Sequence, residues 1–394
     1  MARKFVIKEA TRQRCKIVQM NSERIRRLYK PISLELFHFI GEADSIDFSV
    51  FIRVGDEMVE YIRPTELSQE LLQHIWKASL KPGSGIDVCV LRDEYPRFEH
   101  VIETVRRRKL DALMEKEPGL DPKVLHVFGD LSGASQMILR GGINQEVASR
   151  VSSAASFMVS NLMDNEFAMG TLSRMINIDP TLYDHSAAVA MFAGIMARQY
   201  MGNKLSRRDG QIIAQCGLYH DAGKSCIPNA ILNKPGSFTE EEYEVMKSHV
   251  IHGYDELKKA IDGGAPIDEI VALVALEHHE RFTGKGYPSQ KKGRLEEDPE
   301  NGIHLYSRII AIADSYSALL MERVYKPALE ANKALELLSQ HSHVHFDPDI
   351  FGPFVNSVRS SLDSVEAAGC SRGKIFRSDD QSQSLVQQIR RKIG

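Results

Sequence analysis

The strongest constraint on this chain is a set of histidines and aspartates embedded in apolar, helix-like stretches. The pair His220-Asp221 ends one apolar run, Asp314 ends a second, and His278-His279 follow a third. A carboxylate in an apolar run is costly unless a cation or hydrogen-bond donors compensate it. A lone histidine in such a setting is usually a core residue, but so many together indicate a shared polar site.

The chemistry of this set favours a pair of metal ions. Imidazole and carboxylate ligands together suit iron, manganese, zinc or nickel. The five cysteines are scattered, which argues against a structural zinc site and against a disulfide framework. Two metals joined by a carboxylate are a standard device for phosphoester hydrolysis, because they lower the pKa of bound water and stabilise phosphoryl charge. The residues alone thus make phosphoester hydrolysis the leading reaction class.

The order of the motifs resembles the HD-GYP family of the HD phosphohydrolase superfamily. The stretch His220-Asp221-Ala222-Gly223-Lys224 is similar to the superfamily signature. The narrower resemblance rests on an ordered series: Met246-Lys247-Ser248-His249, His278-His279-Glu280, Gly286-Tyr287-Pro288, Arg308 to Asp314 and Phe346-Asp347-Pro348. Together these motifs cover roughly half of the chain.

The resemblance implies a mainly α fold, a helical-bundle catalytic domain, and two divalent ions, iron or manganese. It implies hydrolysis of cyclic di-GMP to the linear dinucleotide, GMP or both, by a metal-activated hydroxide. The implied metal ligands are His185, His220, Asp221, His249, His278, His279 and Asp314. Asp221 would bridge the ions, and Lys224 would neutralise a phosphate or help the leaving oxygen. The implied substrate contacts are Lys234, Lys285, Tyr287, Arg308 and Arg323, with Lys326 as a further cation.

Two positions depart from the family pattern. Thr283 stands where the tyrosine motif usually begins with aspartate, so we expect weaker discrimination between guanine and adenine, while Lys285 adds positive charge. Thr181 stands where members with three metals have glutamate, so we expect two ions rather than three. The alternating histidines nearer the C-terminus are expected to be loop residues: His341, His343 and His345.

The hydrophobic pattern divides the chain into four parts. Residues 1–125 predict a small α+β domain with a sensory or regulatory role, residues 126–170 a helical connector, and residues 171–360 the catalytic domain. Residues 361–394 are polar and predict a mobile tail. Within the first part we expect strands at 48–54, 58–62 and 86–91, a helix capped by Ser68, and a helix at 99–116.

Composition limits the setting and the partners. The net charge is −3, so we expect no direct binding to nucleic-acid polymers. No signal peptide or membrane span is visible, and the cysteine usage fits a reducing cytosol, which predicts a cytoplasmic protein. The expected partner is a cyclic dinucleotide. Further candidates are a second copy of the chain, in a homodimer, and proteins that bind the Gly286-Tyr287-Pro288 loop.

Three alternatives stay open at this point. The first is a catalytically weak receptor that binds a cyclic dinucleotide and signals through a partner. The second is an enzyme that prefers a mixed GMP–AMP cyclic dinucleotide or a linear dinucleotide. The third is an HD module whose main task is scaffolding.

Overall fold

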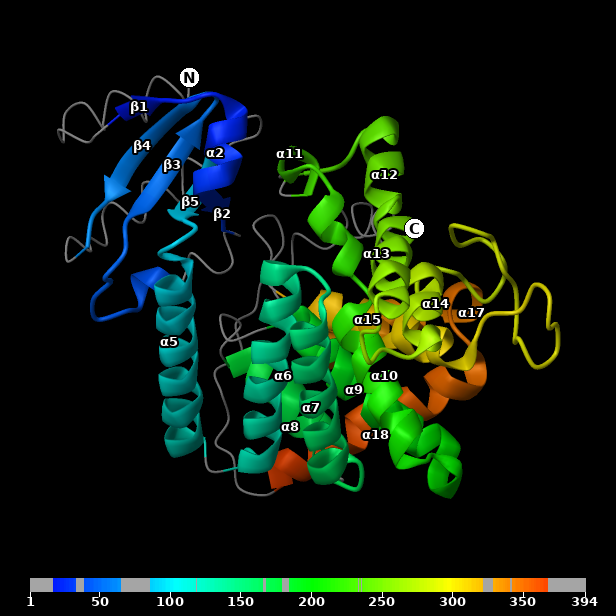
Figure 1. Ribbon diagram of the computed structural model, residues 1–394. Coiled ribbons are helices and arrows are strands. Elements are labelled where there is room, and N and C mark those ends of the chain that lie inside the picture. Colours follow the sequence, from blue (N-terminus) through cyan, green and yellow to red (C-terminus); the bar gives the residue numbers. More distant parts are fainter. Residues whose placement is uncertain are drawn as a thin grey trace. The chain divides into compact units, whose positions relative to one another are not determined.

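The computed structural model forms two compact units, Met1–Ala112 with Asn233–Gly236, and Leu113–Leu232 with Ser237–Gly394. The residues that it describes are 17–32, 39–64, 86–117, 119–165, 168–178, 184–232, 234, 236–321, 329–340 and 342–367. The expected architecture is confirmed: a small α+β region precedes a mainly helical domain (Figure 1). None of the helices in these ranges has the length and apolar character that crossing a membrane requires.

The N-terminal unit is built on a five-stranded antiparallel sheet in the order β1-β4-β3-β5-β2. Its strands are β1 (Ile17–Gln19), β2 (Tyr29–Pro31), β3 (Val50–Val54), β4 (Glu57–Ile62) and β5 (Ile86–Leu91). Side chains alternate between the two faces of a strand, so each face of the sheet can bury its own apolar set. Helix α5 (Tyr95–Lys116) covers one face and α2 (Ser22–Leu28) the other.

The predicted strands correspond to β3, β4 and β5, and the predicted helix corresponds to α5. Strands β1 and β2 and helix α2 were not predicted, and each of the two strands has only three residues. The helix expected after Ser68 lies outside the described residues.

The helical unit is arranged around α9 (His185–Met201), whose residues from Ala187 to Ala197 are all buried. A helix that is apolar on every side belongs at the centre of a bundle. Its neighbours include α6 (Pro122–Gly141), α10 (Arg207–Tyr219) and α15 (Leu305–Leu320) (Figure 1). The remaining helices are α7 (Gln145–Leu162), α8 (Ala168–Ile178), η2 (Gly202–Lys204), η3 (Ala222–Cys226), α11 (Asn229–Leu232), α12 (Glu240–Lys247), α13 (His249–Asp262), α14 (Glu269–Glu277), α16 (Ala331–Ser339), α17 (Ser342–His345) and α18 (Pro348–Ala367).

Helices α6 and α7, expected as a connector that leads into the catalytic domain, belong to the same compact unit as that domain. Two details differ from the sequence-based picture. Helix α18 continues to Ala367, so the first residues of the expected tail are helical. His343 and His345 lie in the short helix α17 rather than in a loop, because Ser342–His345 form a helical turn.

Close packing of α9 against α10 depends on Gly217. A Cβ atom at this position would lie 2.4 Å from Ala190 Cα and 2.5 Å from Ala190 N. Backbone atoms cannot move aside as a flexible side chain can, so any larger residue separates the two helices. Since α10 ends at His220, this contact also fixes where that histidine lies.

We predict that Gly217→Ala lowers the free energy of unfolding by about 1–3 kcal/mol or more, as overpacking of a core does. Gly133 in α6 is the matched control, because a Cβ atom there meets only the end of the Arg150 side chain, at 3.7 Å. Gly133→Ala should leave stability unchanged or raise it by about 0.5–1 kcal/mol, since alanine suits a helix better. Chemical denaturation of both variants measures the difference, and equal stabilities would contradict the packing argument.

Candidate metal centre

Helix ends bring the candidate ligands together. His185 and His249 are the first residues of α9 and α13, and His220 and His278 are the C-caps of α10 and α14. Asp221 and His279 follow the two caps, and Asp314 lies in the middle of α15. The structure thus gathers all seven residues into one cluster, in groups whose ligand atoms lie within 4.8 Å of one another.

The first half-site consists of His185, His220 and Asp314. His185 Nε2 lies 3.0 Å from Asp314 Oδ1, and His220 Nε2 lies 3.8 Å from the same oxygen. Bonds from a divalent metal to nitrogen or oxygen are about 2.0–2.2 Å, so two ligands of one ion can be about 4 Å apart. The spacing of these atoms fits one ion.

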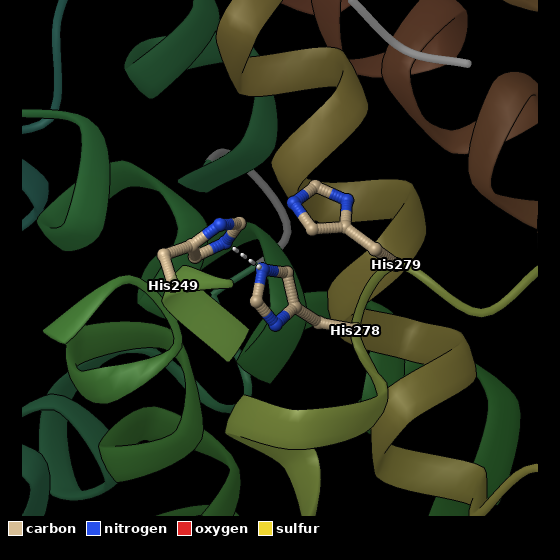
Figure 2. Close-up of side chains that lie close together, drawn as sticks. All are labelled: His249, His278 and His279. Carbon is tan, nitrogen blue, oxygen red and sulfur yellow. Dashed lines mark hydrogen bonds between the residues drawn. The ribbon is translucent and has the colours of Figure 1, made fainter. Parts of the chain in front are cut away.

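The second half-site consists of His249, His278 and His279, whose rings converge (Figure 2). His249 Nε2 lies 3.4 Å from His278 Nε2. The rings of His278 and His279 are 4.1 Å apart at their centroids. Three imidazoles that face one another across such distances suit a second ion.

Asp221 lies between the two half-sites and turns one oxygen toward each. Its Oδ2 is 3.3 Å from His220 Nε2, whereas its Oδ1 is 3.4 Å from His249 Nε2 and 3.8 Å from His278 Nε2. Asp221 Oδ1 and His220 Nε2 are buried and make no hydrogen bond. Buried polar atoms without a partner are rare and need an explanation, and a pair of cations supplies one. The residues present therefore fit the metals that the motifs imply.

Hydrogen bonds at the far side of each ring fix its orientation. In His220, His249 and His278, Nδ1 donates to the backbone carbonyl three residues earlier, over 2.7–2.9 Å. His185 Nδ1 lies 2.9 Å from the buried Ser317 Oγ. A proton held on Nδ1 leaves the Nε2 lone pair available to a metal. Ser317 was not identified from the sequence, because only the fold shows that α15 approaches His185.

The electrostatics favour neutral imidazoles at His249 and His279 and a charged carboxylate at Asp221. Burial lowers the pKa of His249 to about 4. Burial, together with electrostatic repulsion from His249, lowers the pKa of His279 to about 3. Burial alone would raise the pKa of Asp221, but Lys224 and His220 lower it well below the usual value. Burial alone would lower the pKa of His220, yet the nearby carboxylate of Asp221 raises it. Negative charge at the centre of the cluster thus attracts a cation.

Lys224 reaches this centre from η3. Its Nζ donates to Asp221 Oδ2. The spacing of His220, Asp221 and Lys224 along the sequence is that of residues on one face of an α-helix. The chain instead forms a 3-10 helix here, in which residues three apart lie directly above one another. Gly223 allows η3 to pack on α13, because a Cβ atom there would lie 2.0 Å from His249 O.

The tyrosine motif packs directly against the second half-site. The ring of Tyr287 stacks on His279 with centroids 4.8 Å apart, and Tyr287 N donates to His279 O. A Cβ atom on Gly286 would lie 2.5 Å from that same carbonyl oxygen, so only glycine lets the loop pass so closely. Tyr287 is half-buried, whereas Lys285 is exposed to solvent.

Thr283 has a structural contact that the sequence did not suggest. Its Oγ1 and its backbone N donate to Val344 O over 2.9 and 3.3 Å. An aspartate carboxylate cannot donate and would face the carbonyl oxygen. Thr283 thus has a structural role, and it no longer supports the expectation of weaker discrimination between guanine and adenine.

Two buried glutamates next to His278 and His279 anchor the loop that carries Tyr287 between α14 and α15, which we call the tyrosine loop. Glu280 accepts hydrogen bonds from the backbone N atoms of Ser289 and Lys291, at 2.7 and 3.0 Å. Glu277 accepts from the Lys291 ammonium group and from Ser307 Oγ. The loop is thus tied to the segment that carries His278 and His279. Glu280 belongs to a motif that the sequence singled out, but its role required the fold.

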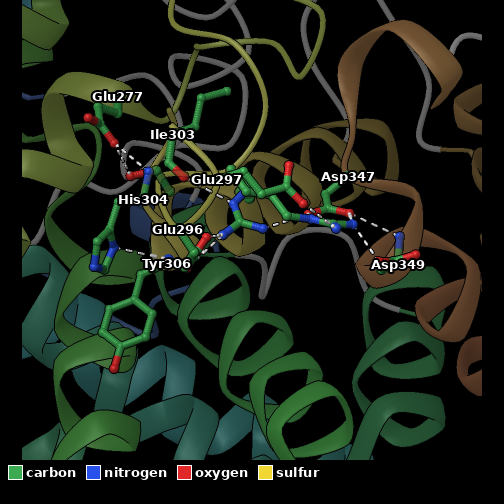
Figure 3. Close-up of polar contacts among 11 residues, drawn as sticks. Glu277, Glu296, Glu297, Ile303, His304, Tyr306, Asp347 and Asp349 are labelled. Carbon is green, nitrogen blue, oxygen red and sulfur yellow. Dashed lines mark hydrogen bonds and ion pairs between the residues drawn. The ribbon is translucent and has the colours of Figure 1, made fainter. Parts of the chain in front are cut away.

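Arg308, expected to bind a substrate phosphate, is buried in an ionic network. Two acids of this network, Glu296 and Asp347, are labelled in Figure 3. The Arg308 guanidinium donates to Asp347 Oδ2 over 2.5 Å and to Glu296 Oε2 over 2.7 Å. Arg294 donates to both oxygens of Asp347, at 2.9 and 3.0 Å. These contacts join the tyrosine loop, α15 and the start of α18, so we leave Arg308 out of the proposed substrate contacts.

The other predicted residues are placed as follows. Lys234 lies between α11 and α12 and is half-buried, and its role stays a prediction. Arg323, Lys326, Thr181 and His341 lie outside the described residues. The number of ions, two or three, thus stays a prediction as far as it rests on Thr181.

Comparisons with known proteins agree with the motif series. Residues 170–350 match the HD domain family. The cyclic di-GMP phosphodiesterase response regulator RpfG of Xanthomonas campestris is 40% identical over 156 residues, which are 40% of this chain and 38% of that protein. The cyclic di-GMP phosphodiesterase PA4108 of Pseudomonas aeruginosa is 34% identical over 192 residues, 48% of this chain and 42% of that protein.

Two further similarities extend beyond the HD segment. The 3'3'-cGAMP-specific phosphodiesterase 3 of Vibrio cholerae is 28% identical over 259 residues, 65% of this chain and 52% of that protein. The structure of Bd1817, an HDG"Y"P protein from Bdellovibrio bacteriovorus, matches 84% of this chain and 99% of its own, with 18% identity and a TM-score of 0.50. This last likeness shows a shared fold. The chain spans less than half the length of the cyclic di-GMP relatives named above.

We predict that Asp347→Asn lowers the free energy of unfolding by about 3 kcal/mol, because it leaves buried guanidinium charge uncompensated. Asp349→Asn is the matched control, since Asp349 also contacts Arg294 but its side chain is 61% exposed, and the cost there should stay below about 1 kcal/mol. Denaturant unfolding of both variants gives the comparison. If Asp347→Asn leaves stability unchanged and weakens substrate binding, Arg308 is a substrate contact rather than part of a structural network.

Proposed function

We propose that this chain, whose residues 170–350 match the HD domain family, is a metal-dependent phosphodiesterase that hydrolyses cyclic di-GMP. The observation that carries the proposal is Asp221, which turns one carboxylate oxygen toward each of two half-sites. All seven implied ligands lie in this one cluster, which supports an enzyme over a degenerate receptor or a scaffold. We propose two ions per chain, iron or manganese.

The residues divide the work between holding ions and handling the substrate. Two divalent ions lower the pKa of bound water and stabilise the charge on phosphoryl oxygens. Burial lowers the pKa of His249 and of His279, which favours neutral imidazoles that bind an ion without releasing a proton. Lys224 places a cation beside the bridging carboxylate, where it would pair with a substrate phosphate or stabilise the leaving oxygen. Tyr287 would contact the nucleotide.

A cyclic dinucleotide is the substrate class that the relatives support. Those with the higher identity are named for cyclic di-GMP. The relative named for 3'3'-cGAMP aligns over 65% of this chain, which keeps a mixed GMP–AMP cyclic dinucleotide as the second candidate. The linear dinucleotide, GMP or both would be the products. Regulation by the N-terminal unit, a homodimer and partners at the tyrosine loop stay predictions.

We expect anaerobically loaded protein to convert cyclic di-GMP, and product analysis on the full chain with iron or manganese tests this. Asp221→Asn should lose both bound metal and turnover, because the bridge loses its charge. Lys224→Met should keep the metal and lose rate by roughly 10²–10³-fold, as when a charge-stabilising donor is removed. Lys204→Met, an exposed lysine in η2, is the control and should match the wild type.

The outcomes separate the competing functions. Equal loss of metal in the Asp221 and Lys224 variants would show that Lys224 supports the cluster rather than the substrate. Binding of cyclic di-GMP without turnover, with both ions present, would favour the receptor. Faster turnover of the mixed cyclic dinucleotide would assign the second candidate instead.

A further inference from the structure

Two tyrosine rings and one lysine lie together at the edge of the second half-site. Lys247 Nζ is 5.2 Å from the centroid of the Tyr243 ring and 5.8 Å from that of Tyr287. All three side chains are half-buried, so each is packed by the fold and still reaches solvent.

The position of this cluster relative to the ligands is set by two contacts. Tyr287 stacks on His279, one of the three histidines of the second half-site. Lys247 ends α12 only two residues before His249, another of the three. Lys224, by contrast, contacts Asp221 Oδ2, the oxygen that faces the first half-site.

Lys247 can exchange its present partner for an anion. Its Nζ lies 2.6 Å from Glu244 Oε1 in the same helix, and the Glu244 side chain is 69% exposed. Ion pairs at the surface contribute little to stability, so a phosphate can replace Glu244 at small cost. The buried pair between Arg308 and Asp347 allows no such exchange.

The chemistry of the cluster matches one unit of a cyclic dinucleotide. Aromatic side chains offer faces and edges on which a purine base can pack, and lysine and arginine bind phosphate through charge-assisted hydrogen bonds. We propose that Tyr243 and Lys247, together with Tyr287, form a subsite for one purine nucleotide of the substrate. This subsite rests on the proposed function and adds to it two residues that would hold the substrate.

The test compares Lys247→Met and Tyr243→Leu with the wild type, using cyclic di-GMP and full-length, metal-loaded protein. Each variant should raise KM about tenfold, the effect of losing one charged hydrogen bond or one base contact. The value of kcat and the bound metal should stay within about twofold of the wild type. Lys259→Met is the matched control, because Lys259 pairs with Glu256 three residues earlier, as Lys247 does with Glu244.

Three results would overturn the subsite. Unchanged KM in both variants, with an active wild type, refutes the subsite alone and leaves the proposed function intact. Loss of metal or of thermal stability in Lys247→Met and Tyr243→Leu shows that the cluster is structural. A metal-loaded wild type that neither binds nor hydrolyses cyclic di-GMP or the mixed cyclic dinucleotide refutes the proposed function, and the subsite falls with it.

Discussion

The carboxylate of Asp221 is the interaction on which the rest of this structure depends. It is buried among imidazoles, and its two oxygens face different sets of ligands. An anion in that position is costly unless cations compensate it, and Lys224 meets only one of its oxygens. The fold therefore holds a charged carboxylate where it attracts cations. The surrounding histidines would supply ring nitrogens as ligands to the ions that bind there.

The scaffold holds this point rigid by close backbone packing and by hydrogen bonds behind the ligands. Gly217 and Gly223 let α10 and η3 approach α9 and α13, which brings the ends of these helices together. Carbonyl groups and Ser317 then orient the rings. Glu280 ties the tyrosine loop to the histidine pair, so Tyr287 and the candidate ligands are held in one framework. A nucleotide bound at Tyr287, as proposed, would lie beside the candidate ligands.

The sequence predicted which residues gather in one cluster, because most of them lie at the ends of apolar helices within an ordered motif, as His220 and His278 do; their role as metal ligands stays a prediction. It could not assign Ser317, because that contact joins residues 132 positions apart. Nor could it show the partners of Arg308, because a motif gives a position along the chain but not the acid that the side chain meets, here Asp347. The short strands β1 and β2 escaped notice since three residues carry too little periodicity.

The central claim is that Asp221 joins two ions in one cluster. Metal analysis combined with electron paramagnetic resonance on manganese-loaded protein tests it most directly. We expect two manganese ions per chain and the spectrum of a spin-coupled pair, and we expect Asp221→Asn to abolish that spectrum. One equivalent, or two ions with independent spectra that persist in Asp221→Asn, would contradict it.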